Sequence, residues 1–271
     1  MATRNPVLNR LERPGFAYAE GKTAFAQATS THATSTHATS DVIRTVGGEP
    51  AVTLNDVVVK SAVLLLVLLG AGLVGWTYGA AQPALIMVAL VVGLGLAFAN
   101  TLMRRVNPVL VIAYALAEGF LLGGISHWYS MSSRPNSNIV YQAVLGTVVA
   151  FVVMLLLYTT RIVRVSGTFF RIMAVGMVSY LVIALASFVA SMFGVGGGWG
   201  FYGVHGIGLL LCVVGVGLAT FSLALDFDAI SRGVAAGLPE RESWRLAFGL
   251  LVTLVWLYLE ILRLLAILNR R

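Results

Sequence analysis

Long apolar runs dominate this sequence and decide what the chain can fold into. Several of them reach 18 residues or more, which is enough for a helix to cross about 30 Å of hydrocarbon. Lipid offers no hydrogen bonds to the backbone, so only helices and closed barrels span it. The alternating pattern of a membrane barrel is absent from the sequence. We therefore expect an all-α polytopic membrane protein with seven transmembrane helices. The expected spans are residues 57–79, 82–103, 107–129, 139–160, 168–194, 203–231 and 243–268.

The composition narrows the possible functions. Hydrophobic residues make up 58% of the chain and charged residues 11%, about half the charged share of a soluble domain. The net charge of +7 sits in loops that flank the spans, so membrane orientation explains it and no nucleic-acid binding is expected. The H-E-x-x-H helix of zinc proteases is absent. We expect no enzyme, no cofactor and no small-molecule substrate, with the lipid bilayer as the main partner.

The first 55 residues differ from the rest of the chain. They are polar and rich in Ala, Thr and Ser, and the segment "ATSTHATSTHATS" at 28–40 repeats with a period of five. Such a segment cannot bury enough apolar surface to offset the entropy of ordering it. We therefore expect a disordered cytoplasmic tail over 1–55 and a seven-helix transmembrane domain over 56–271.

Basic residues in the connections predict the orientation. The connections after the second, fourth and sixth spans carry eight basic residues, whereas the other three connections carry only Arg134. Because basic loops stay in the cytoplasm, the N-terminus is expected there and the C-terminus outside. Arg270 and Arg271 oppose this at the outer end, and a last segment that does not fully cross would remove the conflict. The eight residues are Arg104, Arg105, Arg161, Arg164, Arg171, Arg232, Arg241 and Arg245.

Glycines recur within the spans. Gly119 and Gly123 form a small-xxx-small pair, which is typical of helices that pack closely in lipid. The run "GVGGGWG" at 194–200 lacks the Lys-Ser/Thr ending of a phosphate-binding loop. We expect these glycines to serve helix packing. Further glycines within the spans include Gly70, Gly72, Gly75, Gly93, Gly95, Gly206, Gly208, Gly215 and Gly217.

Few ionisable residues fall within the spans, and such residues commonly mark functional sites. Asp226 and Asp228 end the sixth span. Residues two apart on a helix point about 200° apart, so we expect Asp226 to face the bundle and Asp228 to lie at the interface. Glu260 and Arg263 are three apart in the seventh span and can pair along their own helix.

Glu118 is the remaining acid within a span. It lies about 16 Å from the cytoplasmic start of the third span, close to the membrane midplane. Carboxylates deprived of water hold protons more tightly, and two that lie together share a proton. When both are ionised, a hard cation such as Ca²⁺ can bind between their oxygens. Acids that face the bundle interior therefore predict a cation path gated by protonation.

Three pieces of sequence around these residues resemble the Bax inhibitor-1/YccA family, the transmembrane Bax inhibitor motif proteins. They are "LMRR" at 102–105, "LDFDAI" at 225–230 and "WLYLEILRLLAIL" at 256–268. The seven-span plan from 57 to 268 also fits. The Ser/Thr-rich tail and the pieces "NPV" and "EGFLLG" are similar to an actinobacterial branch of the family.

The resemblance implies six helices around a central one, in the plasma membrane of a bacterium. It also implies a pH-sensitive calcium leak channel whose sensor is a pair of acids in spans 6 and 7. Carried over, these acids are Asp226 and Glu260, which could hold Ca²⁺, and the Arg that contacts the span 6 acid is Arg104. Other family members modulate cell death or a membrane protease. A non-conducting regulator that binds a membrane protease or another membrane protein is therefore the alternative.

The sequence departs from the family pattern in several places. Leu225 stands where a Tyr is typical, and Glu260 replaces an Asp, which lengthens one sensor arm by a methylene. The family's acid in the second span is absent. By depth, Asp226 and Glu260 lie more than one helical turn apart, which makes Glu118 the nearer partner unless span 7 tilts or starts late. Arg104 can equally be a topology signal alone.

Overall fold

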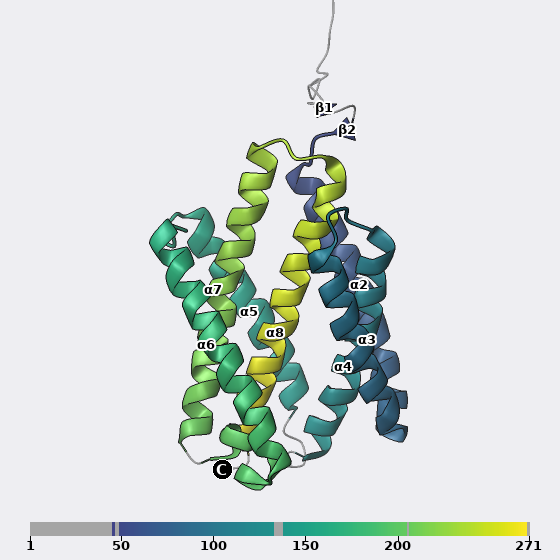
Figure 1. Cartoon of the computed structure of the whole chain (residues 1–271), viewed down its shortest axis with the longest axis vertical. Helices are drawn as coiled ribbons and strands as arrows, with labels where there is room; N and C mark the ends of the chain where they lie inside the picture. Colours follow the sequence, from purple (N-terminus) through teal and green to yellow (C-terminus); the bar gives the residue numbers. More distant parts are fainter. Residues whose placement is uncertain (1–44, 47–48, 133–137, 205, 270–271) are drawn as a thin grey trace, which may run out of the picture. The chain divides into compact units, whose positions relative to one another are not determined.

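Seven helices of the structure are long and apolar enough to cross a membrane, so the predicted number of spans is confirmed. The structure is a computed structural model that describes residues 45–46, 49–132, 138–204 and 206–269. Residues 43–271 form one compact unit, which Figure 1 shows as a helical bundle. Most of the predicted tail, residues 1–44, lies outside the described residues. The helices are α2 Leu54–Ala81, α3 Pro83–Leu102, α4 Pro108–Ser132, α5 Ile139–Thr159, α6 Gly167–Met192, α7 Ile207–Ala235 and α8 Ser243–Asn269.

The first spanning helix starts earlier than predicted, and ordered backbone precedes it. Thr53 caps α2 in a capping box with Asp56, whose carboxylate accepts from the Thr53 backbone at 2.9 Å. Before it, the short strands β1 Thr45–Val46 and β2 Glu49–Pro50 pair antiparallel. The predicted boundary at residue 56 therefore falls inside the first turn of α2, because a Thr-x-x-Asp cap satisfies the free N–H groups of the helix start.

The segment before α2 is held by the connection between α7 and α8. Ala51 forms a β-bridge with Pro239, and the Val52 N–H donates to the Leu238 carbonyl at 2.7 Å. Val52 is buried, and it clusters with Val57 and with Ile230 of α7. These long-range contacts order a polar segment that has no periodic pattern of its own.

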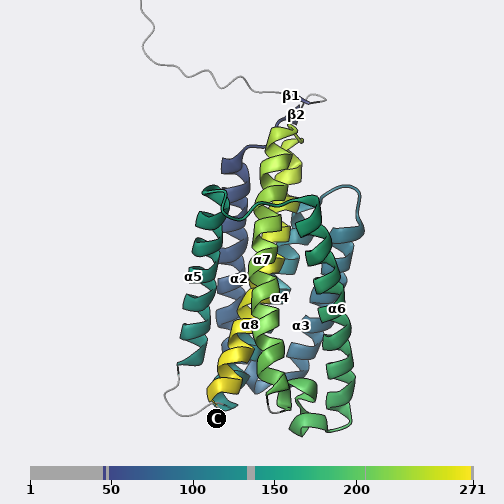
Figure 2. The same cartoon turned by 90° about the vertical axis from the view of Figure 1, so that its left-hand side faces the viewer.

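The last helix, α8, occupies the middle of the bundle. Helices α2, α4, α5 and α7 pack directly against it, and it lies between them in Figures 1 and 2. Three of its leucines, Leu251, Leu257 and Leu262, are almost completely buried. Helix α3 packs on α4, and α6 packs on α7 and on the connection that follows it. The helix that carries Glu260 is therefore the central one.

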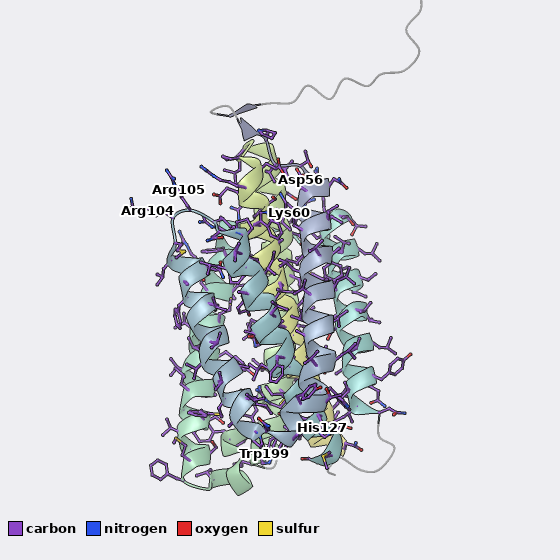
Figure 3. All side chains as sticks on the ribbon, turned by 90° about the vertical axis from the view of Figure 1, so that its right-hand side faces the viewer. Asp56, Lys60, Arg104, Arg105, His127 and Trp199 are labelled. Atoms are coloured by element: carbon purple, nitrogen blue, oxygen red, sulfur yellow. The ribbon has the colours of Figure 1, made fainter. Side chains whose placement is uncertain are left out.

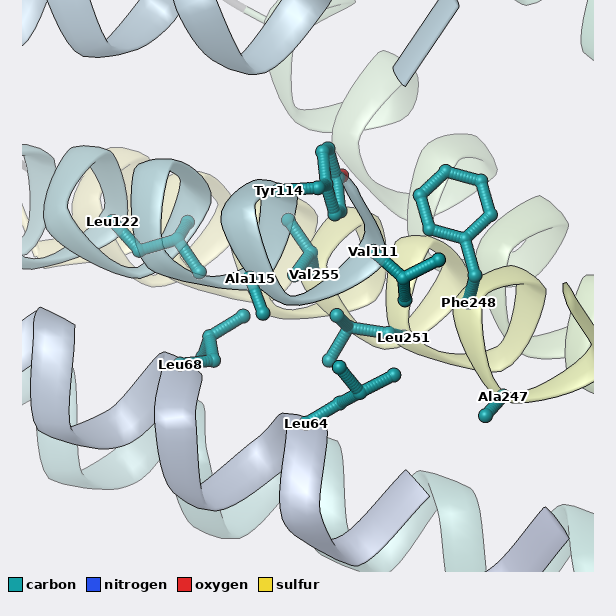
Figure 4. Close-up of a cluster of buried hydrophobic side chains, with 10 residues drawn as sticks. All are labelled: Leu64, Leu68, Val111, Tyr114, Ala115, Leu122, Ala247, Phe248, Leu251 and Val255. Carbon is teal, nitrogen blue, oxygen red and sulfur yellow. The ribbon is translucent and has the colours of Figure 1, made fainter. Parts of the chain in front are cut away.

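The main apolar core joins α2, α4 and α8, as Figure 4 shows. Tyr114 meets Phe248 edge-to-face with ring centroids 5.0 Å apart. On the outward faces many large apolar side chains are exposed, as expected for surfaces that contact lipid tails. The core residues are Leu64, Leu68, Val111, Tyr114, Ala115, Leu122, Ala247, Phe248, Leu251 and Val255.

Glycines bring the backbones of α2 and α4 into direct contact. A Cβ at Gly75 would collide with the backbone of Phe120, and one at Gly123 would collide with that of Gly72. A Cβ at Gly119 would meet the carbonyl of Leu68. The predicted role of the Gly119–Gly123 pair in close helix packing is confirmed, since only a residue without a side chain fits there.

Candidate functional site

Asp226 faces the central helix from the last third of α7. Its Oδ1 lies 3.7 Å from the position that a Cβ would take at Gly249 of α8, and the side chain of Thr253 hydrogen-bonds the carboxyl group. Its Oδ2 is buried and has no hydrogen-bond partner in the described part of the chain. An ionised carboxylate in this position is buried and forms no ion pair with the described Lys and Arg side chains, which is costly in hydrocarbon.

Asp228 points to another side of α7. Its carboxylate pairs with Arg232, one turn later, at 2.7 Å, and the Arg232 side chain is 69% exposed. The two acids diverge, as their spacing predicts. Asp226 therefore faces the bundle, whereas Asp228 belongs to an ion pair at its surface.

Glu260 is neutralised within its own helix. It is 2% exposed, and Nη1 of Arg263 lies 3.0 Å from each of its carboxylate oxygens. The indole N–H of Trp256 donates to Oε1 at 3.1 Å. The pairing three residues apart is the local one that the sequence allows.

The structure does not bring Asp226 and Glu260 together. Asp226 lies beside Gly249 and Thr253, and Thr253 precedes Glu260 by seven residues, or about 10 Å along a helix. Among residues 45–46, 49–132, 138–204 and 206–269, no three His, Cys, Asp or Glu side chains gather as a metal site would need. A Ca²⁺ held jointly by Asp226 and Glu260 therefore does not fit this arrangement.

Glu118 lies on α4 and faces α3. Its Oε2 is 3.1 Å from the position that a Cβ would take at Gly93, so the glycine leaves room for the carboxylate. Within the described residues it has no hydrogen bond or ion pair. Tyr114, one turn away, packs on Phe248, the neighbour of Gly249. Glu118 and Asp226 thus face different helices, α3 and α8.

Arg104 lies in the connection after α3 and points away from the bundle in Figure 3. Its side chain forms no ion pair with the described acids. Instead, Arg245 of α8 donates from Nη2 to the carbonyls of Met103 and Arg104 at 2.9 and 3.1 Å. The backbone of the "LMRR" piece is therefore bound to α8. The charged side chain in this contact is that of Arg245 of α8, and the Arg104 side chain takes no part in it.

Lys60 belongs to a polar group that the sequence did not single out. Its Nζ lies 3.2 Å from Oε1 of Glu240 and 2.6 Å from the Ser243 hydroxyl, and it sits over the Trp244 ring. These contacts fix the start of α8 against α2, near the top of the bundle in Figure 3. The sequence contains one signal that could have identified this group: Lys60 lies within an apolar run, and a lysine within a membrane span usually pairs with an acid.

The sequence was compared with curated proteins and with models of protein families. A search of curated proteins with the sequence finds no match. The family model described as Bax inhibitor 1 like matches residues 5–270. That match covers all seven spanning helices as well as the acids of α4, α7 and α8. The chain is therefore a multi-pass membrane protein that belongs to the Bax inhibitor 1 like family.

Proposed function

We propose that this protein is a passive cation leak, with Ca²⁺ as the permeant ion, whose conductance changes when Asp226 gains or loses a proton. One observation carries the proposal: an acid oxygen of Asp226 is buried against the central helix without a partner among the described residues. No catalytic residues and no bound cofactor are part of this proposal.

The physical argument concerns the contact between α7 and α8. A neutral Asp226 can remain packed against Gly249 and Thr253, because a protonated carboxyl loses little by leaving water. An ionised one needs water or a cation, so the helices must admit one or the other. Protonation thus favours the close packing of α7 on α8, and ionisation favours a packing that admits water or a cation. A cation can neutralise the ionised form.

Glu260 has a different place in this proposal. Arg263 and Trp256 already satisfy its carboxylate, so it needs no proton to be stable in the bundle. Asp226 is therefore the proposed sensor, in place of the pair of Asp226 and Glu260 that the resemblance implies.

Ca²⁺ flux in liposomes tests the function. We expect the wild-type flux to differ between about pH 6 and pH 8, the range in which perturbed functional groups commonly titrate. Protein-free liposomes at the same pH values provide the baseline. A flux equal to this baseline at every pH would remove the proposal.

We also propose that the protein lies in a bacterial plasma membrane with the start of α2 on the cytoplasmic side. The connections after α3, α5 and α7 carry exposed arginines, namely Arg104 and Arg105, Arg161 and Arg164, and Arg241, and basic loops remain in the cytoplasm. In a Cys212→Ser background, an impermeant maleimide added outside intact cells should label Gln82→Cys but not Arg105→Cys. The reverse pattern would invert the orientation.

A regulatory role without conduction is the second candidate, with a membrane protease or another membrane protein as partner. The observation in its favour is that residues 51 and 52 are bridged to the α7–α8 connection, so a partner that binds the chain before them could act on α8. Deletion of residues 1–42 removes no residue of the compact unit formed by residues 43–271. Loss of cellular activity in this deletion, in a protein whose liposomes never conduct, would favour this role.

A further inference from the structure

The connection between α6 and α7 folds back onto the bundle. It contains two short helices, η2 Val195–Gly198 and η3 Gly200–Gly203, and we call residues 195–203 the cap. Gly200 is buried at a φ of 59°, and a Cβ there would collide with the Ser187 backbone. The Ser187 hydroxyl accepts from the Phe201 N–H at 3.0 Å. The cap is thus fitted closely to α6.

Tyr202 is the cap residue that reaches the central helix. It is 8% exposed, and the Arg263 guanidinium lies over its ring, 4.6 Å from the centroid. Its hydroxyl donates to that of Tyr180 of α6 at 3.0 Å. Burial raises the pKa of Tyr202, so the hydroxyl keeps its proton for this bond. Arg263 is itself fixed by Glu260. The cap, α6 and α8 are therefore joined through the side chains of Tyr202, Tyr180 and Arg263.

Trp199 attaches the cap to a third helix. Its ring stacks on Trp128 of α4 at 5.2 Å and meets Tyr129 at 5.5 Å. In Figure 3 Trp199 lies at the end of the bundle opposite Asp56 and Lys60. The cap therefore covers the end of the bundle that is remote from the α7–α8 connection.

We propose that Arg263 and Tyr202 form a lock that holds the cap on the bundle and closes its interior to water at this end. A planar guanidinium over a largely buried tyrosine ring is a favourable contact, and the ion pair with Glu260 prevents Arg263 from turning away. The consequence for cations rests on the proposed function: an ion that passes along α8 has to displace this lock.

A natural cysteine can report whether the lock is closed. Cys212 is its single cysteine and is fully buried. It lies on α7 between Gly208, which abuts the Tyr202 carbonyl, and Gly215, which abuts the Tyr180 hydroxyl and lies near Glu260. Release of the cap should therefore expose it.

The test is the rate at which a water-soluble maleimide labels Cys212 in the full-length protein in lipid nanodiscs. Tyr202→Leu should raise this rate about thirtyfold, because it removes both the cation–π contact with Arg263 and the hydrogen bond to Tyr180. Tyr202→Phe keeps the ring over Arg263 and loses only one hydrogen bond, so it should raise the rate about fivefold. Tyr141→Leu, at a tyrosine of α5 that is 65% exposed, should leave the rate unchanged.

The same variants decide between the lock and a general loosening. An unchanged labelling rate in Tyr202→Leu overturns the lock, as does an equal rise in Tyr141→Leu. If Tyr202→Leu does not fold, the graded rise in Tyr202→Phe decides, and its absence overturns the proposal. Labelling does not require conduction. A faster labelling rate in a protein without Ca²⁺ flux would retain the lock and remove the proposed function.

Discussion

Replacing Asp226 by Asn is expected to abolish the pH dependence of the Ca²⁺ flux. The amide has the size of the protonated carboxyl and never acquires a charge, so the contact with Gly249 and Thr253 stays in its neutral form at every pH. At pH 8 the variant should conduct at the rate that the wild type shows at pH 6. Liposome flux measured from about pH 6 to pH 8 gives this comparison directly.

Asp228→Asn is the matched control, since it makes the same chemical change two residues later. Asp228 is paired with an exposed Arg232 on another side of α7, and a surface ion pair contributes about 0–1 kcal/mol. Its variant should keep the wild-type pH dependence. If Asp228→Asn removes the dependence and Asp226→Asn does not, the sensor has been assigned to the wrong acid.

The largest loss of stability is expected from Gly75→Leu. A side chain at this position collides with the Phe120 backbone of α4, and no rotamer change can relieve a clash with backbone. We expect a loss of more than about 4 kcal/mol, which few single substitutions reach. After purification in detergent, the variant should give little or no monodisperse peak in size-exclusion chromatography. Any folded fraction should unfold at a much lower temperature than the wild type.

Gly70→Leu serves as the control on the same helix. Its Cβ position has nothing within 4 Å, so a leucine there should point into lipid and change stability by less than about 0.5 kcal/mol. Equal losses in the two variants would mean that any leucine in α2 is harmful, and that the contact with α4 is not the cause.

The helices could be predicted because each one is encoded by a long, continuous run of apolar residues. Runs of about 20 apolar residues need no distant contact to identify them, and the ends of the seven helices lie within a few residues of the predicted ones. The residues directly before α2 belong by their polarity to the predicted tail. Ala51 and Val52 are held by Pro239 and Leu238, nearly 190 residues later, and sequence periodicity does not contain such a contact.

The site was predictable to the extent that helix geometry determines it. Periodicity separates Asp226 from Asp228 and allows Glu260 to pair with Arg263, and both arrangements occur. Which residues face Asp226 depends on how far α8 is shifted along α7, and sequence does not give this shift. The same holds for the cap, where positive φ angles at Gly196, Gly197 and Gly200 direct the backbone and leave no repeating pattern.

The carboxylic acid C=O stretch in pH-difference infrared spectra is the most direct test of the central claim that Asp226 exchanges a proton inside the bundle. The wild-type protein in liposomes, taken from pH 8 to pH 6, should gain an absorption band from a protonated carboxyl shielded from water. That band should be missing in Asp226→Asn and present in Asp228→Asn. An identical band in wild type and Asp226→Asn would show that the proton is taken up elsewhere, and would contradict the account.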